Sequence, residues 1–299
     1  MKILCIGHAA YDITIPMDHF PVENTKNRVK ERVECGGGPA SNSAYLLGKW
    51  GMDVAFAGVV GKDLYGDRIK KEFDEIGVNT KYLEQNGTYE TTSSMIIANK
   101  SAGSRTILTY RKEDMRMKPI ELDFEPDIIL LDGQEYELSK ELLKRYPNAI
   151  SIIDAGRPTD EIIELSKMVN YVVCSKEFAE EVSGIQMNYD SIETMTDLYM
   201  KLESIFHNHL VVTLESQGCL YQYENQVKLM TSIKVDAVDS TGAGDIFHGA
   251  FTYGIANGFD YETTIKISNI AGGLSVTKVG GRYSIPTKEE VRELCADFR

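Results

Sequence analysis

A loop of small residues that ends in an acid is the part of this sequence best suited to chemistry. Gly242, Ala243 and Gly244 come directly before Asp245, and an apolar pattern typical of a helix follows. Backbone N–H groups at a helix start lack intrahelical partners and favour an anion, and glycine lets a phosphate approach them closely. The loop therefore predicts an anion-binding turn. The competing interpretation is a plain strand-to-helix turn in which Asp245 stabilises the first helical turn.

Phosphoryl transfer is the chemistry that fits an acid beside such a loop. The reaction needs an anion cradle, Mg2+ and a group that takes or orients the proton of the attacking hydroxyl. We therefore interpret Asp245 as the base, with the N–H groups of Gly242, Ala243 and Gly244 stabilising charge on the transferring group. A Walker loop is excluded because G-x-x-x-x-G-K-[ST] occurs nowhere, and the glycine spacing does not match the dinucleotide-binding pattern.

The composition limits the class of protein and its partners. The 299 residues suffice for one large α/β domain or two smaller ones, and 42% hydrophobic with 26% charged residues is typical of a globular protein. A formal charge of -13 disfavours nucleic acid and anionic membranes, so a bound phosphate must be held locally. The first apolar run is too short for a signal peptide and no run approaches a membrane span, so we expect a cytoplasmic protein.

Cysteines and histidines give no sign of a transition-metal site. The five cysteines are scattered and never form a C-x-x-C pair, which predicts buried free thiols rather than disulfides or zinc ligands. The five histidines include no H-E-x-x-H stretch. We assign no transition metal.

Short β-rich runs alternate with helical patterns along most of the chain. Such alternation predicts an α/β fold with a mainly parallel central sheet flanked by helices. Two segments break the rhythm: residues 12–35 are extended and polar, and residues 87–112 read as a β-hairpin whose turn contains Ala102, Gly103 and Ser104. We expect these segments to form a small β-sheet that acts as a lid.

Three stretches of the sequence resemble the signatures of one enzyme family. D-S-T-G-A-G-D-I-F-H-G-A-F resembles the C-terminal signature of ribokinase-like (PfkB-type) carbohydrate kinases, and G-G-G-P-A-S-N-S-A resembles their N-terminal one. G-V-V-G-K-D-L-Y-G between them is a third match. The resemblance spans the chain and implies a single ribokinase-like kinase domain over residues 1–299, with a lid from about 12–35 and 87–112. In motif detail it is closest to ketohexokinase-like and fructokinase-like members.

The resemblance also assigns substrate contacts. Asp12 follows the first strand and would accept hydrogen bonds from two sugar hydroxyls, and the glycine pair would lie beside the sugar and form part of a hinge. Taken alone, the same residues read as a strand end, a flexible turn and solvated polar groups. The implied substrate-binding residues are Asp12, Gly37, Gly38, Asn42, Arg105 and Asp245.

The nucleotide and metal contacts follow the resemblance less closely. ATP is the implied donor with Mg2+ bridging its phosphates, but the N-x-x-E stretch of many members reads C-S-K-E here, so Glu177 is the nearest acid for Mg2+, through water. A glycine of the T-L-G-x-x-G run is replaced by Glu215. Activation by a monovalent cation such as K+ occurs in parts of the family and stays open here. The implied nucleotide-binding residues are Thr213, Glu215, Gly218, Thr241, Gly242, Gly244, Asn269 and Gly272.

The expected function is therefore ATP-dependent phosphorylation of a small carbohydrate, with a ketohexose such as fructose as the favoured acceptor. A nucleoside kinase and a sugar-phosphate kinase of the same fold are alternatives, and the latter needs extra cationic residues near Arg105. A non-catalytic sugar-binding regulatory protein is the alternative of another class. Apolar lid positions such as Met95, Ile97 and Ile107 predict a homodimer that pairs through the lid.

Overall fold

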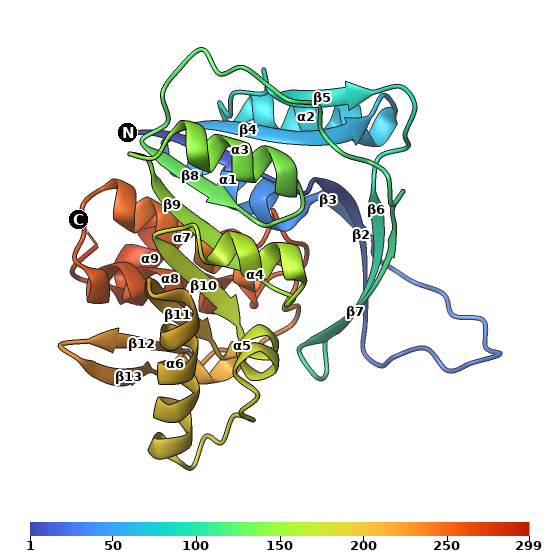
Figure 1. The fold of residues 1–299 in the computed structure, drawn as a ribbon. Helices are drawn as coiled ribbons and strands as arrows, with labels where there is room; N and C mark the ends of the chain where they lie inside the picture. Colours follow the sequence, from blue (N-terminus) through green and yellow to red (C-terminus); the bar gives the residue numbers. More distant parts are fainter. Residues whose placement is uncertain (299) are drawn as a thin grey trace.

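A nine-stranded sheet runs through the centre of the molecule (Figure 1). The computed structural model describes residues 1–298. The strand order is β13-β12-β11-β10-β9-β8-β1-β4-β5, and all neighbouring strands are parallel except those paired with β12. The strands are β1 (Lys2–Ile6), β4 (Asp53–Gly61), β5 (Leu83–Asn86), β8 (Ile128–Leu131), β9 (Ile150–Ala155), β10 (Tyr171–Ser175), β11 (His209–Thr213), β12 (Cys219–Tyr223) and β13 (Gln226–Met230).

Helices cover both faces of this sheet, because its strands are apolar on both sides. In β1, Ile3 and Cys5 belong to one core, while Leu4 and Ile6 belong to the other. The first core includes residues of α1 (Pro39–Lys49), α2 (Leu64–Glu75), α7 (Ala243–Ala256), α8 (Tyr261–Ser275) and α9 (Lys288–Leu294). The second includes residues of α3 (Tyr136–Arg145), α4 (Asp160–Ser166), α5 (Lys176–Ser183) and α6 (Ile192–Phe206). The 3-10 turn Glu215–Gln217 separates β11 from β12. No helix within residues 1–298 has the length and apolarity needed to cross a membrane.

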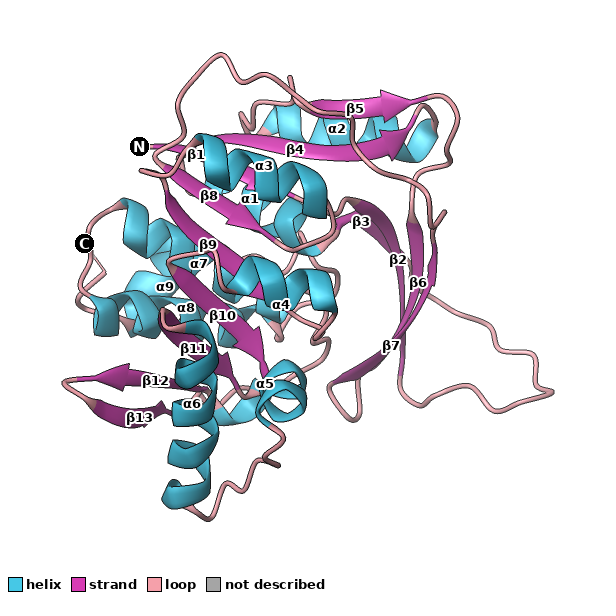
Figure 2. Cartoon of the chain, viewed as in Figure 1, coloured by secondary structure: helices cyan, strands magenta, loops and turns pink. Residues whose placement is uncertain are grey.

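A second, four-stranded sheet lies beside the main domain (Figure 2). Its order is β3 (Val33–Gly37), β2 (Ala10–Met17), β6 (Ser93–Asn99) and β7 (Ser104–Tyr110), with β2 parallel to β6 and the other pairs antiparallel. Gly103 has φ 60° in the β6–β7 turn, where glycine is favoured, and Ser104 already belongs to β7. Residues 18–32, between β2 and β3, extend away from the molecule as a loop (Figure 1). The α/β fold with a small separate sheet is confirmed.

Two helices begin after a glycine with positive φ, whereas several others begin with a side-chain cap. The side chains of Asp63, Ser175 and Thr287 each accept a backbone N–H at the start of their helices. Helices α1 and α7 instead begin after Gly38 and Gly242, both with positive φ, and have no side-chain cap. In α1 the first N–H, that of Ala40, donates to the Asp132 side chain at 3.1 Å, whereas within residues 1–298 the first N–H groups of α7 have no side-chain partner.

Candidate active site

The candidate site lies at the point of the central sheet where the strand order reverses. From β1 the chain builds the sheet through β4 and β5 on one side and through β8 to β11 on the other. Ligands of open α/β sheets bind outside the carboxyl ends of the strands at such a point. Asp132, directly after β8, accepts hydrogen bonds from the backbone N–H groups of His8 (2.8 Å), Gln134 (2.9 Å) and Ala40 (3.1 Å). It thereby fixes the start of α1 at the reversal point.

Direct hydrogen bonds join α1 to the acid at the start of α7. Asn42 Nδ2 donates to Asp245 Oδ2 at 2.7 Å, and Ser43 Oγ donates to the Asp245 carbonyl at 2.9 Å. Gly249, one turn further along α7, packs so closely on α1 that an added β-carbon would lie 3.2 Å from Leu46 Cβ. The two family-like signatures, far apart in the sequence, therefore meet at Asp245.

The loop before Asp245 leaves backbone donors free. Gly242 has φ 77°, and the N–H of Ala243 makes only a long contact of 3.4 Å to the Ser240 carbonyl. Within residues 1–298 no acceptor pairs with the N–H groups of Gly244 and Asp245. Gly244 is exposed, and an added β-carbon there would meet nothing within 4 Å. Exposed, unpaired N–H groups at a helix start are what an anion requires.

A buried acid, Asp239, fixes the shape of this loop through hydrogen bonds. Asp239 is 1% exposed, and its Oδ1 accepts from the N–H (2.9 Å) and the hydroxyl (2.6 Å) of Thr241. Its Oδ2 accepts from the Gly280 N–H at 2.9 Å. Thr241 is itself buried, so its hydroxyl serves the loop's shape in this structure.

Asp12 lies on β2, against Gly37. It is 6% exposed, and burial raises its pKa to about 6, although a hydrogen bond from Ser94 lowers it. The negative charge of Asp245 contributes to the increase. An added β-carbon on Gly37 would lie 2.0 Å from Asp12 Oδ2, and one on Gly38 would lie 2.4 Å from the His8 carbonyl.

One polar atom of the Asn42 side chain has no hydrogen-bond partner within residues 1–298. Its amide nitrogen is used by Asp245, whereas its Oδ1 is buried and has no hydrogen-bond partner within residues 1–298. A buried acceptor without a partner is costly, so a donor from a ligand would be stabilising there. The predicted sugar contacts Asp12, Gly37, Gly38 and Asn42 are thus brought together with Asp245.

Only some of the predicted nucleotide-binding residues lie against the loop before Asp245. Gly272 of α8 lies against the loop, since an added β-carbon would be 3.2 Å from the Ala243 carbonyl. Asn269, one turn earlier, donates Nδ2 to the Thr231 carbonyl at 2.8 Å. Thr213 ends β11 and donates its hydroxyl to the Cys174 carbonyl at 3.1 Å. Asn269 and Gly272 thus belong to α8, and Thr213 belongs to the end of β11.

Two further nucleotide candidates belong to the β11–β12 turn. Glu215 is exposed and has φ 53°. Gly218 has φ 103°, and an added β-carbon would lie 1.9 Å from the Met230 carbonyl, so the turn itself requires glycine. No backbone hydrogen bond joins this turn to Gly242 or Gly244 among the described residues.

Glu177 lies in the first turn of α5, next to the carboxyl end of β10. Its side chain is exposed and has no ion pair within residues 1–298. The described residues contain no group of three or more histidine, cysteine or acidic side chains that could hold a metal. The single exposed carboxylate of Glu177 fits Mg2+, because this ion is usually held by one or two carboxylates together with phosphates and waters.

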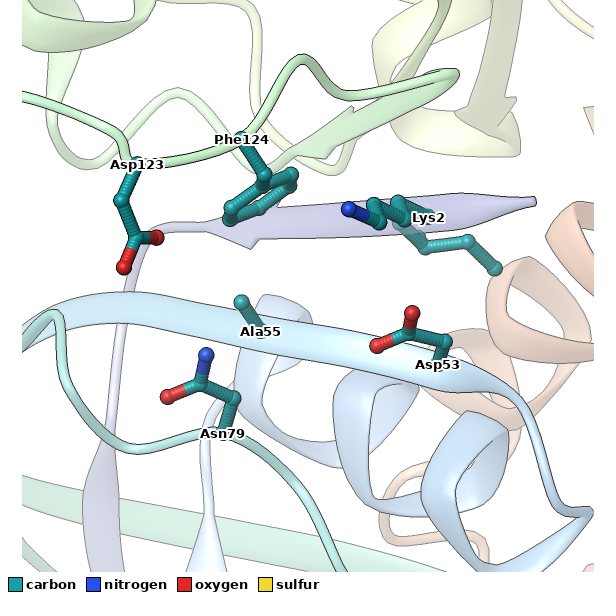
Figure 3. Close-up of a pocket in the computed structure, with 7 residues that line it drawn as sticks. Lys2, Asp53, Ala55, Asn79, Asp123 and Phe124 are labelled. Carbon is teal, nitrogen blue, oxygen red and sulfur yellow. The ribbon is translucent and has the colours of Figure 1, made fainter.

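A pocket of about 270 Å3 lies elsewhere and is not this site (Figure 3). It is lined by residues at the amino ends of β1 and β4 and by residues of the segments that precede β5 and β8. Lys2, Asp53, Asn79, Asp123 and Phe124 surround it.

Some residues of the site escape sequence reasoning. Arg282 is 1% exposed, pairs with Glu72 at 2.6 Å and donates to Ser41 Oγ at 2.5 Å. Its guanidinium lies where a side chain at Gly36 would be, because an added β-carbon there would be 2.3 Å from Cζ. Arginine is ordinarily a surface residue, and nothing in G-G-R-Y indicates burial. His248, by contrast, belongs to the C-terminal signature quoted above, three residues after Asp245. Its place in that signature could have indicated that it lies near the site.

Together the parallel sheet, the anion-binding loop and the acid beside it define an α/β phosphotransferase. A family model for pfkB family carbohydrate kinases matches residues 1–288. The chain belongs to this family, and it is a phosphotransferase of the sugar or nucleoside kinase type.

Similar proteins support the same class. The chain is 26% identical to a ribokinase of Staphylococcus aureus, over 98% of this chain and 99% of that protein. It is 28% identical to fructokinase-1 of rice (Oryza sativa subsp. japonica), over 88% of each. Among solved structures, a putative ribokinase from Agrobacterium tumefaciens superposes with a TM-score of 0.89 at 26% identity, covering 99% of this chain and 98% of that one. The ribokinase-like fold is confirmed, whereas these relatives do not select fructose over ribose.

Proposed function

We propose that the protein transfers the γ-phosphoryl group of ATP to a hydroxyl of a small sugar, with Asp245 as the base. One observation carries this proposal: the Asp245 side chain is held by Asn42 at 2.7 Å at a helix start where the N–H groups of Gly244 and Asp245 have no partner within residues 1–298. The N–H groups would receive the transferring phosphoryl group, and Asp12 would orient the acceptor. Asp245 would then take the proton of the attacking hydroxyl.

The nucleotide would enter from the side of Gly272 and Thr213. Support comes from the solved ribokinase of Arabidopsis thaliana, a protein of the same fold that was crystallised with ribose and ATP. Mg2+, with Glu177 as a ligand through water, would neutralise charge on the phosphates. A sugar with a primary hydroxyl, either a ketohexose such as fructose or a pentose such as ribose, is the proposed acceptor.

A panel assay tests this proposal. ADP release from ATP and Mg2+ is measured with fructose and other ketohexoses, aldohexoses, ribose, nucleosides and sugar phosphates, with D245N alongside. We expect one sugar to support turnover that D245N loses. Near-normal turnover in D245N would refute the role of Asp245, and selective turnover of nucleosides would replace the sugar by a nucleoside.

A sugar-phosphate acceptor is the second candidate, and two arginines of the small sheet favour it. The register Ser94↔Thr109 places Arg105 on the face of β7 that also carries Thr109, next to Ser94 and Asp12 on the neighbouring strands, and Arg111 directly follows β7. Arg105 donates to Ser240 Oγ at 2.8 Å, and neither arginine has a carboxylate within 4.0 Å in residues 1–298. Cations without ion pairs on a face that overlies the site suit an anionic acceptor. Preferential turnover of sugar phosphates in the panel, lost in R105Q or R111Q, would establish this candidate.

We also propose that the small sheet is a lid and the contact surface of a homodimer. Gly103 and Arg105 touch Ala237 and Ser240, so the hairpin already reaches the segment that leads into the anion-binding loop. On the outer face Met95, Leu108 and Tyr110 are exposed, and β7 is an edge strand. Ile97 shares this face, whereas Ile107 lies on the inner one. Sedimentation of the wild type and of a M95E/L108E variant tests the dimer.

A further inference from the structure

A buried histidine links the anion-binding loop to the central sheet. His248 of α7 is 3% exposed. Its Nδ1 lies 2.6 Å from the Gly244 carbonyl and 3.3 Å from Asp154 Oδ2, and its Nε2 lies 3.0 Å from the Val173 carbonyl. Asp154 and Val173 are register partners on β9 and β10. The ring therefore ties the first turn of α7 to the carboxyl ends of two strands.

Both ring nitrogens face oxygen acceptors only. A neutral imidazole has a single N–H, so its other nitrogen would turn a lone pair towards an oxygen at about 3 Å. A ring with an N–H on both nitrogens satisfies every contact. Its positive charge is then balanced by Asp154, whose side chain is 13% exposed. The contacts thus favour a buried imidazolium–carboxylate pair.

The partner of this imidazolium is one end of a catalytically important peptide unit. The carbonyl of Gly244 and the N–H of Asp245 belong to the same rigid, planar peptide. That N–H is one of the two donors left free for an anion. A hydrogen bond from a charged donor to the carbonyl fixes the orientation of the N–H and polarises the peptide, which strengthens the N–H as a donor.

We propose that His248, charged and paired with Asp154, is a positioning residue that holds the Gly244–Asp245 peptide in the orientation phosphoryl transfer requires. This inference rests on the proposed role of the anion-binding loop. It is independent of which sugar the enzyme accepts. His248 itself touches neither the nucleotide nor the sugar in this arrangement.

The surroundings of Asp154 predict a pH signature. Burial raises the pKa of Asp154 to about 7; His248 lowers it, and the charges of Asp245 and Asp132 raise it. Cys174 on β10 is the other titratable neighbour, and its own pKa is raised by burial and by Asp154. As the pH falls through about 7, Asp154 takes up a proton and the imidazolium loses its counter-charge.

The test compares H248N, H248Q and D154N, with the acceptor identified by the sugar panel. H248N keeps a donor near the Gly244 carbonyl but carries no charge, and H248Q moves the donor towards Val173. Removing one donor of an anion-binding hole costs about 10²- to 10³-fold in kcat, so loss of its orientation should cost roughly 10- to 100-fold. We expect kcat to fall more in H248Q than in H248N, with KM for the acceptor nearly unchanged.

The pH profile separates positioning from simple destabilisation. We expect the step in kcat near pH 7 to vanish in D154N, because no carboxyl remains to titrate. In H248N the step should move to higher pH, since Asp154 loses the charge that lowers its pKa. T252V is the matched control: Thr252 is buried on the same helix and donates to the His248 carbonyl at 2.9 Å. It should lower the melting temperature and leave kcat and the pH step in place.

A second readout does not depend on activity. In 15N spectra of the folded protein at pH 7.5, both ring nitrogens of His248 should resonate as protonated, and D154N should change this signal. A neutral ring, or wild-type kcat and pH profile in both H248N and H248Q, would overturn the inference. If D245N retains turnover, the proposed function fails instead; if D245N is inactive while the His248 variants are normal, only this inference fails.

Discussion

Gly37→Ala should remove sugar recognition while leaving the nucleotide side intact. The three atoms nearest to an added β-carbon all belong to Asp12: Oδ2 at 2.0 Å, Cγ at 2.4 Å and Oδ1 at 2.8 Å. No rotation of so short a side chain keeps its carboxylate in place beside the new methyl group, so Asp12 must turn away. The backbone of Gly37 does not have positive φ, so alanine introduces no backbone strain there.

The size of the effect follows from the hydrogen bonds that Asp12 would lose. A hydrogen bond to a charged group contributes about 1.5–3 kcal/mol, so two sugar hydroxyls correspond to about 3–6 kcal/mol. Since about 1.4 kcal/mol is a factor of ten, kcat/KM for the sugar should fall roughly 10²- to 10⁴-fold. Most of this should appear as a higher KM for the sugar, with KM for ATP nearly unchanged.

Steady-state kinetics with each substrate varied in turn, together with thermal melting, measure this. Gly87→Ala is the control, because an added β-carbon there meets nothing within 4 Å and the backbone does not have positive φ. The reasoning is refuted if Gly37→Ala melts like the wild type and retains its KM for the sugar, since Asp12 would then not bind the acceptor.

Three other perturbations test separate parts of the site. D245N should lower kcat by at least about 10³-fold with the melting curve preserved, because the amide cannot take the proton; turnover within tenfold of wild type contradicts this. The pKa of Asp12 is raised to about 6 by burial, so KM for the sugar should increase as the pH falls through 6 and should lose this dependence in D12N. E177Q should raise the Mg2+ concentration needed for half-maximal turnover, measured at saturating ATP, and an unchanged Mg2+ titration would remove Glu177 from the metal site. Replacing K+ by tetramethylammonium in the same assay shows whether a monovalent cation is needed.

The sequence predicts the parts of this molecule that depend on local pattern. The alternation of apolar runs and helical patterns indicates the parallel sheet, and the Ala102–Gly103 turn indicates the β6–β7 hairpin. The meeting of Asn42 and Asp245 was expected only through resemblance, since no spacing rule connects residues so far apart.

What the sequence could not show is which charged residues are buried. Arg282 contacts Glu72 and Ser41 only because three separate segments converge on it. Asp132 lies in an apolar strand end, where its partners are the backbone N–H groups of other segments. Such contacts depend on the three-dimensional arrangement, and neither composition nor periodicity records them.

The burial of these charges would allow a protein of formal charge -13 to bind a phosphate locally, as we propose. Asp132 and Asp239 each accept three hydrogen bonds from groups of the protein. These bonds offset the negative charge of the two acids and hold α1 and the anion-binding loop in place. The carboxylate of Asp154 lies 3.3 Å from the ring of His248. The positive ends of N–H dipoles at the start of α7 are then the groups that an incoming phosphate meets. In the proposed function, local neutralisation of acids, rather than an excess of lysine and arginine, would make this site receptive to an anion.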